Sequence, residues 1–300
     1  MLSSIDFLSD DFTLKALETD QIDEDSSIED EEILLTDKVI VSTYPSDETN
    51  SLLFYVYSSE YFYPHHEVSY PSLFFDCKVL EDNFVAVSSL SKDVLVFDPK
   101  IKNLDTFTYS LKGHQSNVLC LDYTDSLISG SEDKSIIFWD NLKIKERIQT
   151  NDEIVKLSVC NKLIAYLSND KLVLRSNEEI LKEIKLKEIE DIKLTPTKLF
   201  YSQGEGNLFV LDLVNYTQSS FKIHNEVINT IDFYNDWIVT GSEDKTVKVF
   251  DWVNNKLIRS FKVSDSVTKL KMNEGVCFYG GEDTELSYLN FKNACLKENQ

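Results

Sequence analysis

Glycine is scarce in this chain, with only eight among 300 residues. Phosphate-binding loops and the tight turn that exposes a nucleophilic serine both need closely spaced glycines. Neither G-x-x-x-x-G-K nor G-x-S-x-G occurs in the sequence. We therefore expect a protein without catalytic activity and without a cofactor.

Cysteine is almost as sparse, and its five residues are far apart in the sequence. Zinc sites use cysteine pairs only a few residues apart, and disulfide frameworks are typical of small secreted chains. No such pair is present, so the sequence predicts no metal site and no disulfide. We interpret the five as reduced structural thiols: Cys77, Cys120, Cys160, Cys277 and Cys295.

Long hydrophobic runs are missing as well. A helix that spans a bilayer needs about 20 consecutive apolar residues, and no stretch of this sequence approaches that length. The first residues also lack the basic and apolar pattern of a secretory leader. These observations predict a soluble intracellular protein that does not contact a membrane.

Basic charge is in short supply, because 30 Lys and Arg face 52 Asp and Glu and the net charge is −22. Residues 1–32 alone hold twelve acidic residues against the single Lys15. Such a segment buries too little apolar surface to offset its ordering entropy, so we expect residues 1–35 to be a largely disordered acidic tail. Ile5, Leu8 and Phe12 have rough helical spacing, so this tail could either add solubility or dock on a partner as a short helix.

Two segments of the chain are near copies of one another. Residues 113–140 and 224–251 share a histidine, a Ser/Thr-Gly-Ser-Glu-Asp-Lys run and an apolar run that ends in aspartate. They resemble the WD40 repeat, in which each repeat is a four-stranded blade and blades stack around an axis. Similar apolar runs mark the ends of third strands at Tyr57, Asp98, Asp140, Ser176, Asp212, Asp251 and Asn290.

This spacing predicts an all-β fold, a seven-bladed WD40 propeller over residues 36–300. The blades near residues 151–213 keep the alternating strand pattern but lack the histidine and the tryptophan. In the first blade, residues 39–41 and 52–57 are expected to be strands two and three. Its innermost strand is either residues 32–35 or absent, which leaves the closure of the ring open.

Two of the four histidines have a structural explanation in the WD40 resemblance. In such blades the histidine reaches the aspartate of a tight turn, a hydroxyl on the second strand and the tryptophan of the third, which satisfies buried polar groups. A Ser, His and Asp together also suggest a catalytic triad, an interpretation that we reject for this spacing. The expected networks are His114, Ser129 or Ser131, Asp133 and Trp139, and then His224, Thr240 or Ser242, and Asp244, with Phe250 in place of Trp.

An aromatic run in the first blade resembles the periodic tryptophan protein 1 family of eukaryotic WD40 proteins. In that family an early blade has Tyr-Val-Tyr, an acidic stretch, Tyr-x-His-His-Asp/Glu, a Pro-led segment and Asn-Phe-Val-Ala-Val. The resemblance covers roughly residues 36–291, although family members extend further and carry a basic tail. The matching residues are Tyr55, Val56, Tyr57, Tyr63, His65, His66, Glu67, Pro71 and residues 83–87.

The resemblance implies a role in ribosome assembly. Members of the family are nucleolar scaffolds that join early precursors of the large ribosomal subunit (pre-60S) and support processing of its rRNA. It therefore implies a nuclear, nucleolar protein that is a monomer within a larger particle, with assembly factors and ribosomal proteins as partners. A histone-tail-binding propeller and a substrate adaptor of a ubiquitin ligase remain as alternatives.

Three groups of surface residues are candidates for contacts with partners. Acidic residues in equivalent turns could attract basic protein segments, or could be ordinary polar turn residues: Glu132, Glu205, Glu243 and Glu282. Basic residues could contact precursor rRNA, or could be solvated edge residues: Lys143, Lys145, Arg147, Lys182, Lys185 and Lys187. His65 and His66 could pack between blades or touch a partner, and we favour packing, because Tyr55, Tyr57, Tyr61 and Tyr63 alternate as on a blade surface.

Overall fold

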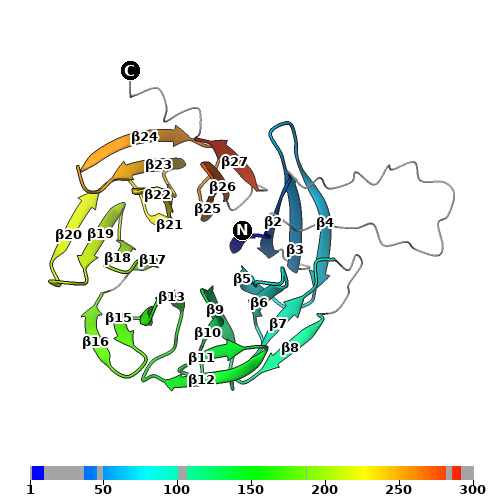
Figure 1. Ribbon diagram of the computed structural model, residues 1–300. Coiled ribbons are helices and arrows are strands. Elements are labelled where there is room, and N and C mark those ends of the chain that lie inside the picture. Colours follow the sequence, from blue (N-terminus) through cyan, green and yellow to red (C-terminus); the bar gives the residue numbers. More distant parts are fainter. Residues whose placement is uncertain are drawn as a thin grey trace.

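The structure is a computed structural model that describes residues 2–9, 37–45, 50–100, 107–186, 188–281 and 286–291. Within these ranges the chain forms strands β1 to β27 and no helix. The strands make seven antiparallel sheets, which radiate like blades around a central axis (Figure 1). The seven-bladed propeller expected from the repeat spacing is thus confirmed.

We number the blades 1 to 7 along the chain. Blade 1 holds β1 (Ser4–Phe7), β2 (Lys38–Pro45), β3 (Asn50–Tyr57) and β4 (Phe62–Tyr70). Blade 2 holds β5 (Phe74–Val79), β6 (Val85–Ser89), β7 (Asp93–Phe97) and β8 (Tyr109–Lys112), and blade 3 holds β9 (Val118–Tyr123), β10 (Leu127–Ser131), β11 (Ser135–Asp140) and β12 (Lys143–Gln149). Blade 4 holds β13 (Lys156–Cys160), β14 (Leu163–Leu167), β15 (Lys171–Ser176) and β16 (Ile180–Lys185).

The remaining blades follow the same order. Blade 5 holds β17 (Ile189–Leu194), β18 (Lys198–Gln203), β19 (Asn207–Asp212) and β20 (Gln218–Lys222). Blade 6 holds β21 (Ile228–Tyr234), β22 (Trp237–Ser242), β23 (Thr246–Asp251) and β24 (Lys256–Lys262). Blade 7 holds β25 (Lys269–Asn273), β26 (Val276–Gly280) and β27 (Ser287–Asn290) within the described residues. Six of the seven predicted third-strand ends match these bounds, and β7 ends at Phe97, one residue before the predicted Asp98.

The hydrophobic core lies between the blades. The second and third strands are buried on both faces, as in the second strand β10 and the third strand β15, because each sheet is covered by a neighbour on either side. Seven apolar clusters result, each of which joins two adjacent blades. No blade buries its faces alone, so the fold depends on an unbroken ring.

The innermost strand of blade 1 is β1, at the very start of the chain. It pairs antiparallel with β2, with Ser4 opposite Thr43 and Phe7 opposite Ile40, and it lies at the inner edge of its blade (Figure 1). Both sequence-based expectations for this strand, residues 32–35 or none, are therefore wrong. The expectation of a disordered tail over residues 1–35 is also wrong for residues 2–9, and residues 10–36 lie outside the described residues.

Burial explains why the first residues fold into the ring. Leu2, Ile5 and Leu8 are 1%, 5% and 5% exposed, so Ile5 and Leu8 of the expected docking helix instead bury their side chains in the ring. Phe12, the third residue of that expectation, lies outside the described residues. The Leu2 amide donates to the carbonyl of Gly281 at 3.2 Å, and the Thr268 hydroxyl donates to the Leu2 carbonyl at 3.2 Å. These contacts join blade 1 to blade 7 and close the propeller.

Candidate functional site

The predicted polar network of blade 3 is present. His114 Nδ1 lies 3.0 Å from Asp133 Oδ2, and His114 Nε2 lies 2.8 Å from the Ser129 hydroxyl. The Trp139 indole N–H donates to the same hydroxyl at 2.8 Å. Ser129 is therefore the network residue, while the Ser131 hydroxyl donates to the Asn117 carbonyl at 2.7 Å.

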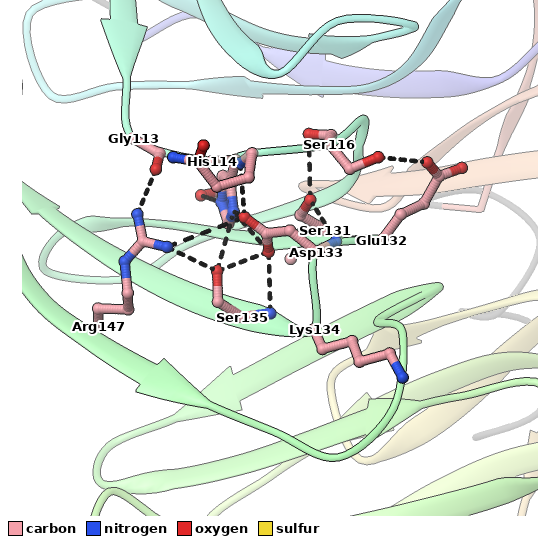
Figure 2. Close-up of polar contacts among 12 residues, drawn as sticks. Gly113, His114, Ser116, Ser131, Glu132, Asp133, Lys134, Ser135 and Arg147 are labelled. Carbon is pink, nitrogen blue, oxygen red and sulfur yellow. Dashed lines mark hydrogen bonds and ion pairs between the residues drawn. The ribbon is translucent and has the colours of Figure 1, made fainter.

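Further groups enclose the Asp133 carboxylate in its turn (Figure 2). It accepts the Ser135 hydroxyl at 2.6 Å and the Gln115 amide at 2.8 Å. Arg147 reaches in from β12, donates to the Gly113 carbonyl and lies 3.9 Å from Asp133 (Figure 2). Arg147 was a candidate for contact with RNA, and the structure shows that its side chain contacts the polar network of its own blade.

Blade 6 repeats the arrangement with one substitution. His224 Nδ1 lies 3.0 Å from Asp244, and its Nε2 lies 2.8 Å from the Thr240 hydroxyl. Phe250 stands where the tryptophan would be and packs in the cluster between blades 5 and 6. The network therefore keeps its histidine and aspartate without the indole donor.

The pKa values describe neutral histidines beside ionised aspartates. Burial lowers the pKa of His224 to about 4, against the attraction of Asp244. Burial alone would raise the pKa of Asp244, but hydrogen bonds from Thr246 and the Asn225 amide lower it to about 2. The pKa of His114 is lowered in the same way, because burial outweighs Asp133.

In the blade 3 network the hydrogen bonds run from Ser129 to His114 to Asp133, the same sequence of residue types as in a catalytic triad. A nucleophile must reach its substrate, however, and Ser129 is 0% exposed and His114 2% exposed. The hydroxyl also accepts the Trp139 indole proton, which fixes it inside the blade. The arrangement stabilises the turn and gives a substrate no access.

Acidification is expected to weaken the fold through His224. The unfolded histidine takes up a proton near its ordinary pKa of 6.5, whereas the folded one resists protonation down to about 4. Stability is therefore full above pH 6.5 and falls as the pH drops toward 4, by up to about 3 kcal/mol for this residue. Urea unfolding at several pH values should show a shallower pH slope in His224→Gln than in the wild type. Identical slopes would contradict the buried neutral histidine.

The candidate acidic residues lie in equivalent turns between second and third strands. Glu132 follows β10, Glu205 follows β18 and Glu243 follows β22, so all three lie at the same end of their blades. Glu282 lies outside the described residues.

These three carboxylates differ in their surroundings. Glu132 accepts a hydrogen bond from Ser116 at 2.9 Å (Figure 2). It accepts another from Asn117 at 3.0 Å, so its carboxylate is occupied by neighbouring residues. Glu205 and Glu243 are exposed. Glu205 and Glu243 are the members of this set that a partner can reach.

The candidate basic residues lie on two outermost strands. Lys143 and Lys145 are exposed on β12, and Lys185 is exposed on β16. The Lys182 ammonium lies 5.1 Å above the Tyr216 ring of the next blade, a cation–π contact. Lys187 lies outside the described residues.

The aromatic run of blade 1 forms the hairpin of β3 and β4. The Tyr57 ring lies 5.1 Å from Phe278 of blade 7, and Tyr55 belongs to the same closing cluster. Tyr63 packs from the other face against the cluster shared with blade 2. Tyr55, Tyr57 and Tyr63 thus pack on the faces of blade 1, whereas Tyr61, the fourth tyrosine of the expectation, is 36% exposed.

The histidine pair belongs to the same hairpin. The His66 ring stacks on Phe54 at 4.3 Å, and the His65 and His66 Nδ1 atoms are 2.9 Å apart. Phe54 is buried in the cluster between blades 1 and 2. The structure thus places His66 at the junction of blades 1 and 2, whereas packing between blades, the preferred expectation for both histidines, is not shown for His65.

Sequence reasoning missed a series of carboxylates on the innermost strands. Each accepts a backbone N–H from the innermost strand of the next blade, which ties neighbouring blades together around the channel. The signal was an aspartate recurring in these strands after an apolar or acidic residue. The bonds are Asp6 to Val79 at 2.8 Å, Asp76 to Leu121 at 3.0 Å, Asp122 to Val159 at 2.7 Å, Asp191 to Ile231 at 2.8 Å and Asp232 to Met272 at 2.8 Å.

Lysines on the innermost strands form ion pairs with four of these five carboxylates. The ion pairs are Lys156–Asp191 at 3.2 Å, Lys193–Asp232 at 3.4 Å, Lys271–Asp6 at 3.6 Å and Lys78–Asp76 at 3.9 Å. The nearby Lys156 charge and burial lower the pKa of Lys269 to about 8. The channel is thus lined by both acidic and basic side chains, and a cavity of about 730 Å³ is bordered by Lys156, Lys269 and Glu243.

The described residues offer little for other chemistry. They contain no group of three or more His, Cys, Asp and Glu side chains placed to bind a metal ion. Cys77, Cys120, Cys160 and Cys277 are free thiols, and Cys295 lies outside the described residues. Within the same ranges no helix is long and apolar enough to cross a bilayer.

Known proteins show where this architecture recurs. Residues 105–140 and 215–251 match the family "WD domain, G-beta repeat". Over 190 residues the chain is 25% identical to the CCR4-associated factor 4 homolog of Vanderwaltozyma polyspora, covering 60% of this chain and 26% of that protein. The chain thus spans about a quarter of that relative. The crystal structure of the WD40 beta propeller domain of Doa1 matches with a TM-score of 0.74 at 16% identity, over 98% of this chain and 94% of that one. The protein is therefore a seven-bladed β-propeller that contains WD40 repeats.

Proposed function

We propose that the protein is a non-catalytic scaffold in ribosome biogenesis, which joins early precursors of the large ribosomal subunit and supports processing of its rRNA. The observation that carries the proposal is the aromatic run of β3 and β4, from Tyr55 to His66. This run resembles the periodic tryptophan protein 1 family and has no counterpart in the two generic repeats.

The surfaces of the propeller suit this role. Exposed Glu205 and Glu243 on one face would attract basic segments of ribosomal proteins and assembly factors. Lys143 and Lys145 on the rim would make local contacts with rRNA. The net charge of −22 opposes long-range attraction to phosphate, so such contacts require a partner that first positions the RNA.

Depletion of the protein from its own cells tests the proposal. Pulse-labelled precursor RNA of the large subunit should accumulate and its mature form should fall, while small-subunit RNA matures at its usual rate. Normal maturation of both would overturn the proposal and favour the histone-binding or ubiquitin-ligase alternative.

A further inference from the structure

A groove opens between blades 2 and 3 at the face opposite the acidic turns described above. It has a volume of about 370 Å³ and is formed by the turn after β5, the strand β8, and the turns after β9 and β11. These turns lie at the other end of the strands from Glu132, because neighbouring strands in a blade run antiparallel. The groove is therefore a separate surface.

Aromatic and aliphatic side chains line the groove. The Phe84 and Tyr109 rings lie 5.8 Å apart, tilted by 60°, and Tyr109 is 45% exposed. Leu142, in the turn after β11, is 39% exposed and also lines the groove. The Tyr123 hydroxyl accepts the Glu81 amide at 3.1 Å, which fixes this ring across the two blades. Apolar side chains thus line the groove beside its polar residues, and the Tyr123 bond links the two blades that form it.

The rim of the groove is acidic, and no compensating cation is found among the residues that the structure describes. Glu81, Asp82, Asp125 and Asp140 are all exposed lining residues. No Lys or Arg lines the groove, and none of these four makes an ion pair with any other part of the chain that the structure describes. Burial raises the pKa of Tyr123, and the charges of Glu81, Asp82 and Asp125 raise it further.

We propose that this groove binds a basic segment of a partner protein, whose arginine or lysine lies against the Tyr109 ring. A cation at this position would make a cation–π contact with the Tyr109 ring and would be attracted by the surrounding carboxylates. An apolar neighbour in the same segment would cover Leu142. The four rim carboxylates repel nucleic acid, so the ligand is a protein segment. The proposal concerns a site separate from the one invoked for ribosome assembly and holds whatever the partner's pathway.

Fluorescence anisotropy with synthetic peptides tests the proposal on the full chain. The probe is a short labelled peptide with a central arginine between two leucines, and its counterpart carries citrulline, which keeps the shape and removes the charge. The arginine peptide should bind more tightly. Tyr109→Ala and Asp125→Asn should each weaken it about tenfold, since each removes one partner of the cation.

Matched controls come from other blades. Tyr216→Ala removes a tyrosine that is 42% exposed, and Asp236→Asn changes the equivalent turn of blade 6. Both should bind the arginine peptide as the wild type does. Equal affinity for the arginine and citrulline peptides, or unchanged affinity in Tyr109→Ala and Asp125→Asn, would overturn the proposal. Competition by a short single-stranded RNA that is lost in Asp125→Asn would overturn it in favour of a nucleic-acid site.

Discussion

A chain that lacks residues 2–8 is expected to lose the cooperative monomeric fold. The deletion removes β1 and the buried side chains of Leu2, Ile5 and Leu8. At about 2 kcal/mol for each side chain, their burial contributes roughly 6 kcal/mol. That is on the order of the whole stability of a typical domain, about 5–15 kcal/mol. The loss also opens the ring between blades 1 and 7, which exposes the apolar cluster that these two blades share.

Thermal unfolding and size-exclusion chromatography measure this effect. The truncated chain should show no sharp transition at the wild-type temperature and should elute as an aggregate or an expanded species. Ile5→Ala should cost about 3 kcal/mol, whereas Leu90→Ala, at a residue that is 53% exposed, should cost almost nothing. A truncated chain that unfolds at the wild-type temperature would show that β1 does not close the ring.

Asp232→Ala is expected to have the second largest effect, about 3 kcal/mol of lost stability. Its carboxylate accepts the Met272 amide at 2.8 Å and pairs with Lys193 at 3.4 Å, so it joins blades 5, 6 and 7 at the channel. Burial alone would raise the pKa of Asp232, but the nearby lysines lower it overall, which keeps the carboxylate charged. Without the Asp232 carboxylate, the Lys193 ammonium loses this ion pair and has less negative charge around it.

Urea unfolding separates the charge from the hydrogen bond. Asp232→Asn keeps an acceptor for the Met272 amide and should cost less than Asp232→Ala. The control Asp236→Ala lies in an exposed turn of the same blade and should leave the midpoint unchanged. If Asp232→Ala matched this control, the channel ion pairs would contribute nothing to the ring.

The sequence predicted the blades well because their signals are local. The apolar run that ends at Asp140 or Asp251 lies within one strand, and its repetition reveals the count. β1 was missed because it is only four residues long and lies far along the chain from β2. In addition, the acidic composition of residues 1–32 masked the apolar pattern of its first residues.

The candidate sites likewise divide into contacts that a local sequence motif predicts and contacts that depend on the assembled ring. The His114–Asp133 and His224–Asp244 contacts were predictable because a repeat motif fixes both partners. The Asp232 hydrogen bond crosses to the next blade, so it follows only from the geometry of the ring. The groove at Tyr109 likewise combines turns of two blades, and no pattern within one repeat indicates it.

The most direct test of the proposed function is gradient sedimentation of the tagged protein from its own cells, with sequencing of the RNA that co-purifies. The account predicts that the protein sediments with large-subunit precursors and enriches unprocessed large-subunit RNA. A protein that remains in the light fractions without precursor RNA would contradict it.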